Sequence, residues 1–416
     1  MKPNHYLSRR QFLTSSGSGL VGLGLVGTVG NLSSYAADEI IISATVGKAR
    51  IPIFLRGYSG EALEVLRFDL EIQGFEIVND LAKADYELTG TDGGQLEGRL
   101  LDTRSKAELH ASSYQGAAPA RALAHRLTDD VVLKVTGTPG IARTKIAFKG
   151  GTGPTAEIYM ADYDGANAFP VTADRKLVDS PAWVPGKRTL LYTSYLKGYP
   201  GIYLHDLSTG ARKAFAEYDG INLGPAVSPD GKRVAMILNK DNAQAQGLYV
   251  CDIDGGNLQR LTTDRSSKSS PTWSPDGKTI CFVSGIPADR YSPGLYTIPA
   301  NGGERVRLRT PAGGTASEPD WSPDGKWIAF TLTPQASSRP SRICRLPAGG
   351  GETENLWWEE VADSMEHASW SPNSRTLILS RQMGDLKVLS LLDAETKVSK
   401  TLSISVKGCS EPAWAK

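Results

Sequence analysis

The stretch Ser270-Pro271-Thr272-Trp273-Ser274-Pro275-Asp276-Gly277-Lys278 recurs along the C-terminal two thirds of this chain, and the repeat indicates the fold. Consecutive copies are 44 to 49 residues apart, measured between the positions equivalent to Trp273. Repeats of this length are typical of β-propellers, in which each repeat forms one blade. The other copies begin at Ser180, Gly224, Glu318 and Ala368, and the chain ends on a sixth start, Glu411-Pro412-Ala413-Trp414.

Turn and strand signals alternate within each repeat. Ser-Pro-Asp-Gly predicts a tight turn, since proline presets φ, aspartate accepts the next position and glycine supplies the left-handed residue. An apolar β run such as Thr279–Ser284 follows the turn. These signals predict blades of four strands, with the recurrent tryptophan packed between adjacent blades. A second hairpin occurs six times, at Ile158–Gly165, Gly201–Gly210, Gly247–Gly256, Gly294–Gly303, Arg342–Gly351 and Leu386–Thr396.

The two ends of the repeat region complement each other. The first unit, from about Ile141, lacks its own Pro-x-Trp strand, while Ser410–Lys416 is such a strand without a blade. We therefore expect a six-bladed β-propeller over residues 141–416, in which the C-terminal strand completes the first blade and leaves no open seam. The alternative is an open solenoid.

The segment before the repeats has a different pattern, with strands and helices mixed. Ala62, Val65, Leu66 and Leu70 have helical spacing, interrupted by Asp69. The pattern predicts a small N-terminal α/β domain over residues 38–137, so the chain is multi-domain, α+β and all-β. Thr138-Pro139-Gly140 joins the two domains. The expected strands are Glu39–Ala44, Ile51–Leu55, Phe75–Val78, Asp85–Thr89 and Gln95–Asp102, and the expected helices are Ser59–Gln73 and Pro119–Thr136.

The N-terminus has the features of an export signal. Arg9 and Arg10 are followed by Phe-Leu, a glycine-rich apolar run over 17–30 and small residues before Ala37. The adjacent arginines resemble a twin-arginine signal. We expect residues 1–37 to be the signal, with cleavage after Ala36, and the mature chain to lie in the periplasm without a transmembrane segment. The alternative is an N-terminal membrane anchor, for which the run is short.

Composition excludes several classes of protein. The chain has 46 Lys+Arg and 45 Asp+Glu, and the signal contains Lys2, Arg9 and Arg10 but no acid, which leaves 43 against 45. This balance indicates no nucleic-acid partner. The 44 glycines and 24 prolines are explained largely by the blade turns. Cys251, Cys281, Cys344 and Cys409 have no metal-ligand spacing; buried free thiols are the favoured interpretation, although an exported protein could pair them.

No catalytic or metal-binding pattern stands out in the sequence. There is no G-x-S-x-G or H-E-x-x-H motif, and the four histidines beyond the signal, His110, His125, His205 and His367, are isolated. The Asp-x-Asp-Gly segments at 162–165 and 252–255 lack the later acidic residue of a calcium loop and are interpreted as turns. We therefore expect no catalytic, metal or cofactor residues and a protein that is not an enzyme.

The tandem Pro-x-Trp-Ser-Pro-Asp-Gly blades, together with the passage from Ala124 to Phe148, resemble the TolB family of the Tol–Pal envelope system, with its WD40-like repeats. The resemblance implies a non-enzymatic periplasmic scaffold that supports outer-membrane integrity and cell division. It also implies a partner like the peptidoglycan-associated lipoprotein (Pal) at one mouth of the propeller, and a TolA-like inner-membrane partner at Asp38, Glu39, Ile40 and Ile41.

The mouth in that family lies where the residues just before each Pro-x-Trp meet. The mouth positions in this chain are Asp179, Ser180, Asn222, Gly224, Ser269, Ser270, Ser317, Glu318 and His367.

Two alternatives to this function remain: a stand-alone periplasmic propeller that binds a peptide or glycan, and an enzyme with its site in the channel.

Overall fold

The computed structural model describes residues 47–416, apart from 94, 117, 241–245, 286–292, 336–338 and 357–362. The predicted export signal, its cleavage site, the strand expected at 39–44 and the partner segment 38–41 lie outside the described residues. No helix within the described residues is long and apolar enough to cross a membrane.

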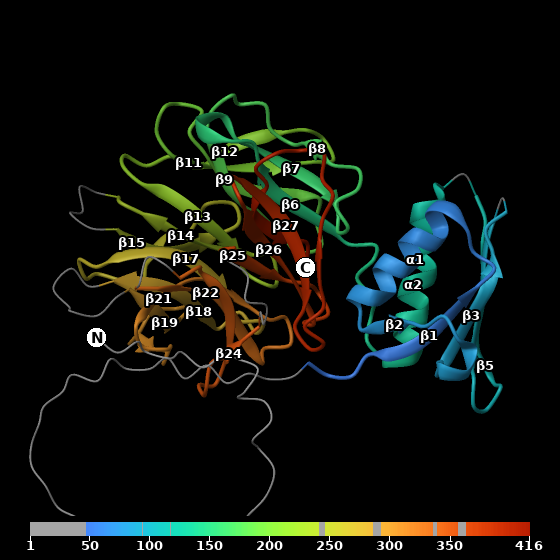
Figure 1. Cartoon of the computed structure of the whole chain (residues 1–416). Coiled ribbons are helices and arrows are strands. Elements are labelled where there is room, and N and C mark those ends of the chain that lie inside the picture. Colours follow the sequence, from blue (N-terminus) through green and yellow to red (C-terminus); the bar gives the residue numbers. More distant parts are fainter. Residues whose placement is uncertain are drawn as a thin grey trace, which may run out of the picture. The chain divides into compact units, whose positions relative to one another are not determined.

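Residues 51–136 form a five-stranded sheet with two helices packed together on one face (Figure 1). The strand order is β2-β1-β3-β4-β5; β1 runs parallel to both neighbours, and the other pairs are antiparallel. The bounds are β1 Ile51–Arg56, α1 Gly60–Ile72, β2 Phe75–Ile77, β3 Tyr86–Thr91, β4 Leu96–Asp102, β5 Glu108–Tyr114 and α2 Ala120–Thr136, with a short 3-10 turn at Leu81–Lys83.

The sequence did not predict β5. Most of its residues are polar, and it lies at the edge of the sheet, so it lacks the apolar alternation of a half-buried strand. Gly137 ends α2 with a φ of 72°, in the left-handed conformation that favours glycine, and its N–H donates to the carbonyl of Leu133.

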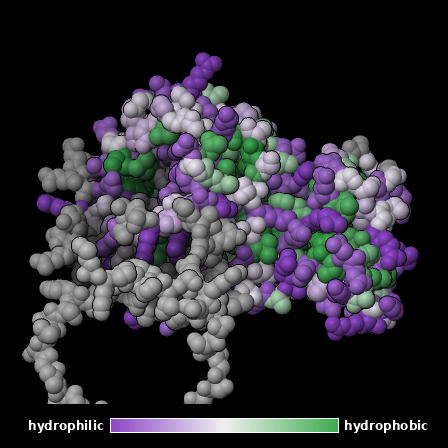
Figure 2. All heavy atoms as spheres, viewed as in Figure 1, coloured by the Kyte–Doolittle hydropathy of each residue, from purple (hydrophilic) through white to green (hydrophobic). Residues whose placement is uncertain are grey.

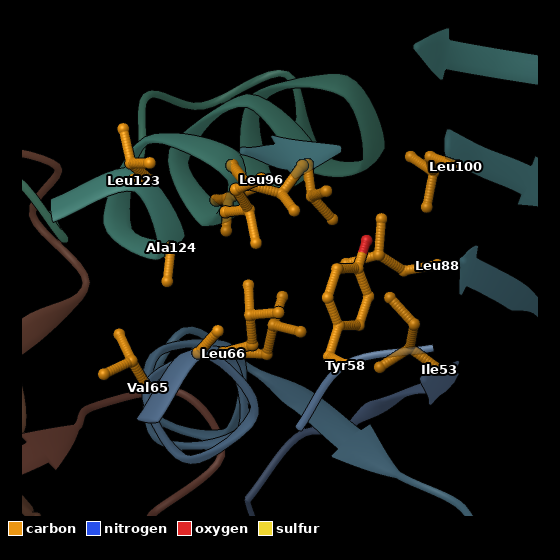
Figure 3. Close-up of a cluster of buried hydrophobic side chains, with 14 of the residues drawn as sticks. Ile53, Tyr58, Val65, Leu66, Leu88, Leu96, Leu100, Leu123 and Ala124 are labelled. Carbon is orange, nitrogen blue, oxygen red and sulfur yellow. The ribbon is translucent and has the colours of Figure 1, made fainter. Parts of the chain in front are cut away.

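Apolar side chains from both helices and the central strands form the core of this region (Figure 3). Leu66 from α1, Leu127 from α2 and Leu88 from β3 are fully buried. Tyr58 adds a polar contact, because its hydroxyl donates to the carbonyl of Glu97 at 3.0 Å. This helix-on-sheet packing confirms the expected small α/β region.

Residues 145–414 form six four-stranded antiparallel sheets, which we number as blades one to six (Figure 1). The innermost strands of neighbouring blades contact one another around the complete ring. Blade one is β29 (Ser410–Trp414), β6 (Lys145–Gly150), β7 (Glu157–Asp162) and β8 (Phe169–Pro170), and blade two is β9 (Val178–Trp183), β10 (Thr189–Ser194), β11 (Gly201–Asp206) and β12 (Arg212–Ala216).

The remaining four blades have the same order, with the first strand innermost. Blade three is β13 (Asn222–Val227), β14 (Arg233–Leu238), β15 (Gly247–Asp252) and β16 (Gln259–Arg260). Blade four is β17 (Ser267–Trp273), β18 (Thr279–Gly285), β19 (Gly294–Pro299) and β20 (Val306–Arg307). Blade five is β21 (Gly314–Trp321), β22 (Trp327–Pro334), β23 (Arg342–Pro347) and β24 (Glu354–Asn355). Blade six is β25 (Met365–Trp370), β26 (Thr376–Met383), β27 (Leu386–Asp393) and β28 (Ser399–Thr401).

The C-terminal strand closes the ring, as the sequence predicted. Strand β29 pairs antiparallel with β6, which joins Ser410 to Lys149 and Trp414 to Ile146. The inner edge of blade one therefore comes from the last residues of the chain. This pairing confirms six blades and excludes the open solenoid.

The repeated tryptophans link neighbouring blades. The indole N–H of Trp273 donates to the carbonyl of Ala226 in blade three at 2.9 Å, and Trp183 and Trp370 make the same kind of bond at 3.1 and 3.2 Å. Trp321 differs, since its N–H faces Gly325 of its own turn at 3.4 Å. The expected packing between blades is confirmed, since the buried cluster around each of these tryptophans, and around Trp414, includes residues of the neighbouring blade.

The four cysteines, Cys251, Cys281, Cys344 and Cys409, are buried and unpaired, as expected. Burial raises the pKa of the Cys251 thiol to about 12, so the reactive thiolate is disfavoured at neutral pH.

Candidate functional site

Each innermost strand has a bulge at the same place, and the bulge residue has a left-handed backbone. The pairing with the second strand shifts there in all six blades. The φ angles lie between 51° and 57°. A proline or Ala368 follows each bulge residue, and proline is tolerated there because a bulge does not require its missing N–H. We call these six residues the mouth ring: Ser180, Gly224, Ser270, Glu318, His367 and Glu411.

The mouth ring lines a cavity of about 750 Å³ that is bounded by all six innermost strands. This volume is in the range of sites for small ligands or for a few inserted side chains. It is too small for a protein domain. The cavity can therefore receive a short segment of a partner.

Glu318 and His367 are neighbouring members of the ring and contact each other twice. His367 Nε2 lies 2.9 Å from Glu318 Oε1, and the backbone N–H of His367 donates to Glu318 Oε2 at 2.8 Å. Burial favours the neutral form of both groups, but their mutual hydrogen bond and charges outweigh it. The pKa of Glu318 is lowered and that of His367 is raised, so the two form an ion pair.

Asp179 and Glu411 add two carboxylates beside this pair. Glu411 accepts from Lys149 Nζ at 2.9 Å and from the backbone N–H of Ser180 at 2.9 Å. Burial, with the nearby charge of Glu411, raises the pKa of Asp179 to about 6. Asp179 therefore changes charge close to neutral pH.

The opposite part of the ring carries no charge. Its members are Gly224 and Ser270, with Leu223 and Ser269 beside them in the cavity wall. Lys268 also lines the cavity, but its ammonium group is bound to Asp264 at 2.9 Å and its side chain is fully buried. The mouth ring and the adjoining Asp179 thus carry charged groups in blades five, six, one and two, and none in blades three and four.

Most of the mouth positions expected from the sequence meet in this cavity. Asp179, Ser180, Gly224, Ser269, Ser270, Glu318 and His367 line it, whereas Asn222 and Ser317 do not. Asn222 is fully buried, and its amide group bonds to the carbonyls of Tyr218 and Pro200, so its role is structural.

The sequence analysis missed Glu411 as a mouth residue, although the signal was present. Glu411 precedes Pro412 in the sixth repeat start, in the position that Glu318 occupies in blade five. Aligning the final start with the others would have identified it.

Exposed apolar residues lie at the same end of the blades as the mouth ring, outside the cavity lining. Leu196 and Tyr199 are in the loop between β10 and β11, at the end of blade two where Asp179 lies. Met383 and Leu386 flank the turn between β26 and β27, at the same end of blade six. On the face shown in Figure 2, hydrophobic residues form separate patches among hydrophilic ones.

One group among the described residues has the composition of a metal site: His125, Asp162 and Asp164. Each carboxylate is already bound by protein groups. Lys145 and Asn167 donate to Asp162, and Arg121 and the backbone N–H of Ala166 donate to Asp164. These bonds favour a hydrogen-bonded turn over a metal site.

Comparison with known proteins gives related sequences and folds. The family model of the TolB β-propeller domain matches residues 132–416. The Tol-Pal system protein TolB of Bordetella pertussis is 30% identical over 326 residues, covering 70% of this chain and 73% of that protein.

Two solved structures share the fold. The crystal structure of TolB from Acinetobacter baumannii has a TM-score of 0.76 at 24% identity and covers 91% of this chain and 98% of its own. Kuenenia stuttgartiensis hydrazine synthase has a TM-score of 0.57 at 10% identity, covering 67% of this chain and 47% of that one. Proteins with different activities thus share the propeller, and the fold alone does not assign a function. The family match over the propeller and the related Bordetella sequence do make an assignment: this chain belongs to the TolB family of Tol–Pal system proteins.

Proposed function

We propose that this chain is a periplasmic, non-enzymatic scaffold of the Tol–Pal system and that its mouth ring binds a Pal-like lipoprotein. The mouth ring is the observation that carries the proposal. Five of its six members are not glycine, and a left-handed conformation is unfavourable for such residues. Backbone strain of this kind persists where the surrounding structure enforces it, and it clusters at binding sites.

The dimensions of the cavity support insertion of a short partner segment. A cavity of about 750 Å³ holds several side chains, while the body of the partner would rest on the exposed Leu196, Tyr199, Met383 and Leu386. Large apolar and aromatic side chains at a rim are typical contact residues of protein interfaces. The charged and neutral parts of the ring would fix the orientation of the inserted segment.

The other parts of the proposal rest on the sequence. Export through the signal at 1–37 would place the chain in the periplasm, where a lipoprotein anchored in the outer membrane is accessible. The residues at 38–41 would bind a TolA-like partner. The function would then be to connect inner-membrane and outer-membrane components and so to support envelope integrity and division.

Titration calorimetry with two purified proteins tests the proposal. The mature chain is titrated with the periplasmic part of the Pal-like lipoprotein from the same organism, and with an unrelated peptidoglycan-binding domain as the control. We expect saturable one-to-one binding of the first protein only. Absence of heat with the Pal-like protein, or equal binding of both proteins, would contradict the proposal.

A further inference from the structure

His125 lies at the centre of a buried group of charged side chains that joins the α/β region to blade one. It projects from α2, and its Nδ1 lies 2.8 Å from Asp69 Oδ2 on α1. Its Nε2 lies 3.4 Å from Asp164 Oδ2, in the turn after β7 of blade one. The imidazole is therefore between one carboxylate of each domain.

The three side chains of this arrangement are almost completely buried. His125 is 4% exposed, Asp69 is 0% exposed, and Asp164 is 9% exposed. A charge taken out of water at such depth is tolerated only when it is paired and hydrogen-bonded. Although burial alone would lower the pKa of His125, its contacts with the carboxylates of Asp164 and Asp69, of which the one to Asp69 is a hydrogen bond, raise it to about 10 and favour the imidazolium at neutral pH.

Other groups complete the cluster from every element around it. The Tyr163 hydroxyl of blade one donates to Asp69, and its ring meets the imidazole edge-on at 5.8 Å between centroids. Arg121 of α2 pairs with Asp164. Asp162, at the end of β7, lies close by but is bound to Lys145.

We infer that the His125 imidazolium, held between Asp69 and Asp164, pins the α/β region to blade one and fixes the two as a single body. This inference is independent of the proposed binding at the mouth ring. His125, Asp69 and Asp164 lie outside the mouth ring, and none of them belongs to it. We call these three residues the joint.

The consequence of removing the imidazolium follows from electrostatics. Asp69 would lose the hydrogen bond and the charge that oppose the upward shift of its pKa by burial, while Asp164 would keep only its pair with Arg121. Breaking a buried ion pair by deleting one partner is strongly unfavourable because the remaining charge stays without water. Separation of the two domains hydrates both carboxylates, so we expect the joint to open while each domain stays folded.

Two further ion pairs cross the same boundary at positions that water reaches. Lys400 of blade six pairs with Glu71 of α1, and Lys48 pairs with Glu395. Pairs that water reaches contribute little to stability. We therefore expect the orientation of the two domains to depend mainly on buried contacts: the joint, the Arg121–Asp164 pair and the packing of Ile72 against the propeller.

Two backbone amides next to the linker report on the state of the joint. The N–H of Ile141 donates to Gln73 Oε1 at 3.0 Å, and the N–H of Ala142 donates to Asp129 Oδ1 at 2.8 Å. Both bonds cross from the start of the propeller to the α/β region. They break when the domains separate, and their hydrogen exchange then accelerates.

Hydrogen–deuterium exchange of full-length mature protein tests the inference. The variants are His125→Gln and, to keep the shape of the joint while removing a charge, Asp164→Asn. The control is His110→Gln, which removes a histidine 3.8 Å from Asp130 within the α/β region. In both joint variants we expect at least tenfold faster exchange in peptides covering 137–144, with unchanged exchange in β10 and β14.

The results that would overturn the inference can be told apart from one another. Unchanged exchange at 137–144 in both joint variants, or equal acceleration in the control, overturns the inference. Acceleration throughout the propeller also overturns it, since the residues would then support the fold rather than the joint. Zn²⁺ is added in a separate run; if it slows exchange in the unmodified protein but not in His125→Gln, the residues are metal ligands and the inference is wrong.

Discussion

His367 and Glu318 face each other across the boundary between blades five and six, with 2.9 Å between Nε2 and Oε1. Both occupy left-handed backbone positions, and Glu318 also accepts the backbone N–H of His367. The ion pair therefore joins two blades at the point where the mouth ring is strained. Its effect on stability is measurable separately from its effect on binding.

Glu318→Gln should lower the free energy of unfolding by about 1.5–3 kcal/mol at pH 6, the typical value of a hydrogen bond to a charged group. The lowered pKa of Glu318 makes its contribution present above about pH 4.5 and lost as pH falls through the lowered value. The raised pKa of His367 makes its contribution present below about 6.5 and lost as pH rises through the raised value. Melting temperatures should thus differ most between pH 4.5 and 6.5, and a difference independent of pH would contradict this.

Asp179→Asn should stabilise the protein at neutral pH. Because the pKa of Asp179 is raised to about 6, ionising it in the folded chain costs free energy that grows as pH rises from about 4 to 6. We expect a gain of about 1–2 kcal/mol at pH 7.5, after allowance for solvent screening, and none at pH 4. Thermal melting at the two pH values measures it. A destabilised variant at pH 7.5 would show that the carboxylate is favourably paired there.

Trp273→Phe should weaken the contact between blades three and four. The change removes the N–H that bonds to the Ala226 carbonyl, and the loss of one such hydrogen bond costs about 0.5–1.5 kcal/mol. Trp321→Phe is the matched control, because the N–H of Trp321 makes only a 3.4 Å contact within its own turn. Chemical denaturation should rank Trp273→Phe as the less stable variant. Equal stability of the two would contradict a role for the indole N–H between blades.

Most of the fold could be predicted from the sequence repeat, because turn chemistry and strand alternation depend on residues that are close together in the chain. Even ring closure followed, since an unpaired first unit and a spare last strand are both visible in the sequence. Strand β5 did not follow, because its polar residues owe their strand conformation to pairing with β4.

The site was less predictable, because it depends on contacts between distant residues. Asp69 interrupts the apolar face of α1, and only the fold shows that it meets His125 and Tyr163, 56 and 94 residues away. The left-handed backbone conformation of the mouth ring could not be predicted either, because five of its six residues are not glycine.

Stability of the joint should decline as the solution becomes alkaline. The pKa of His125, raised to about 10 from an ordinary value of about 6.5, makes its contribution full below pH 6.5. The contribution decreases from there and is lost as pH rises through 10. Melting temperatures of the unmodified protein and of His125→Gln should therefore converge between pH 6.5 and 10. A constant gap over this range would mean that His125 carries no charge in the folded protein.

Binding at the mouth ring, as proposed, requires that a segment of a Pal-like partner enter the cavity. Ser270→Tyr fills the neutral side of the cavity, and the backbone should tolerate it because the ring already holds Glu318 and His367 in the same conformation. Ser208→Tyr, in the exposed turn between β11 and β12, is the control.

The deciding measurement is the dissociation constant of the Pal-like protein for each variant, after melting curves have shown that both are folded. The account predicts at least a hundredfold weaker binding to Ser270→Tyr and unchanged binding to Ser208→Tyr. Unchanged binding to a folded Ser270→Tyr variant would contradict it, because the partner would then bind without entering the cavity.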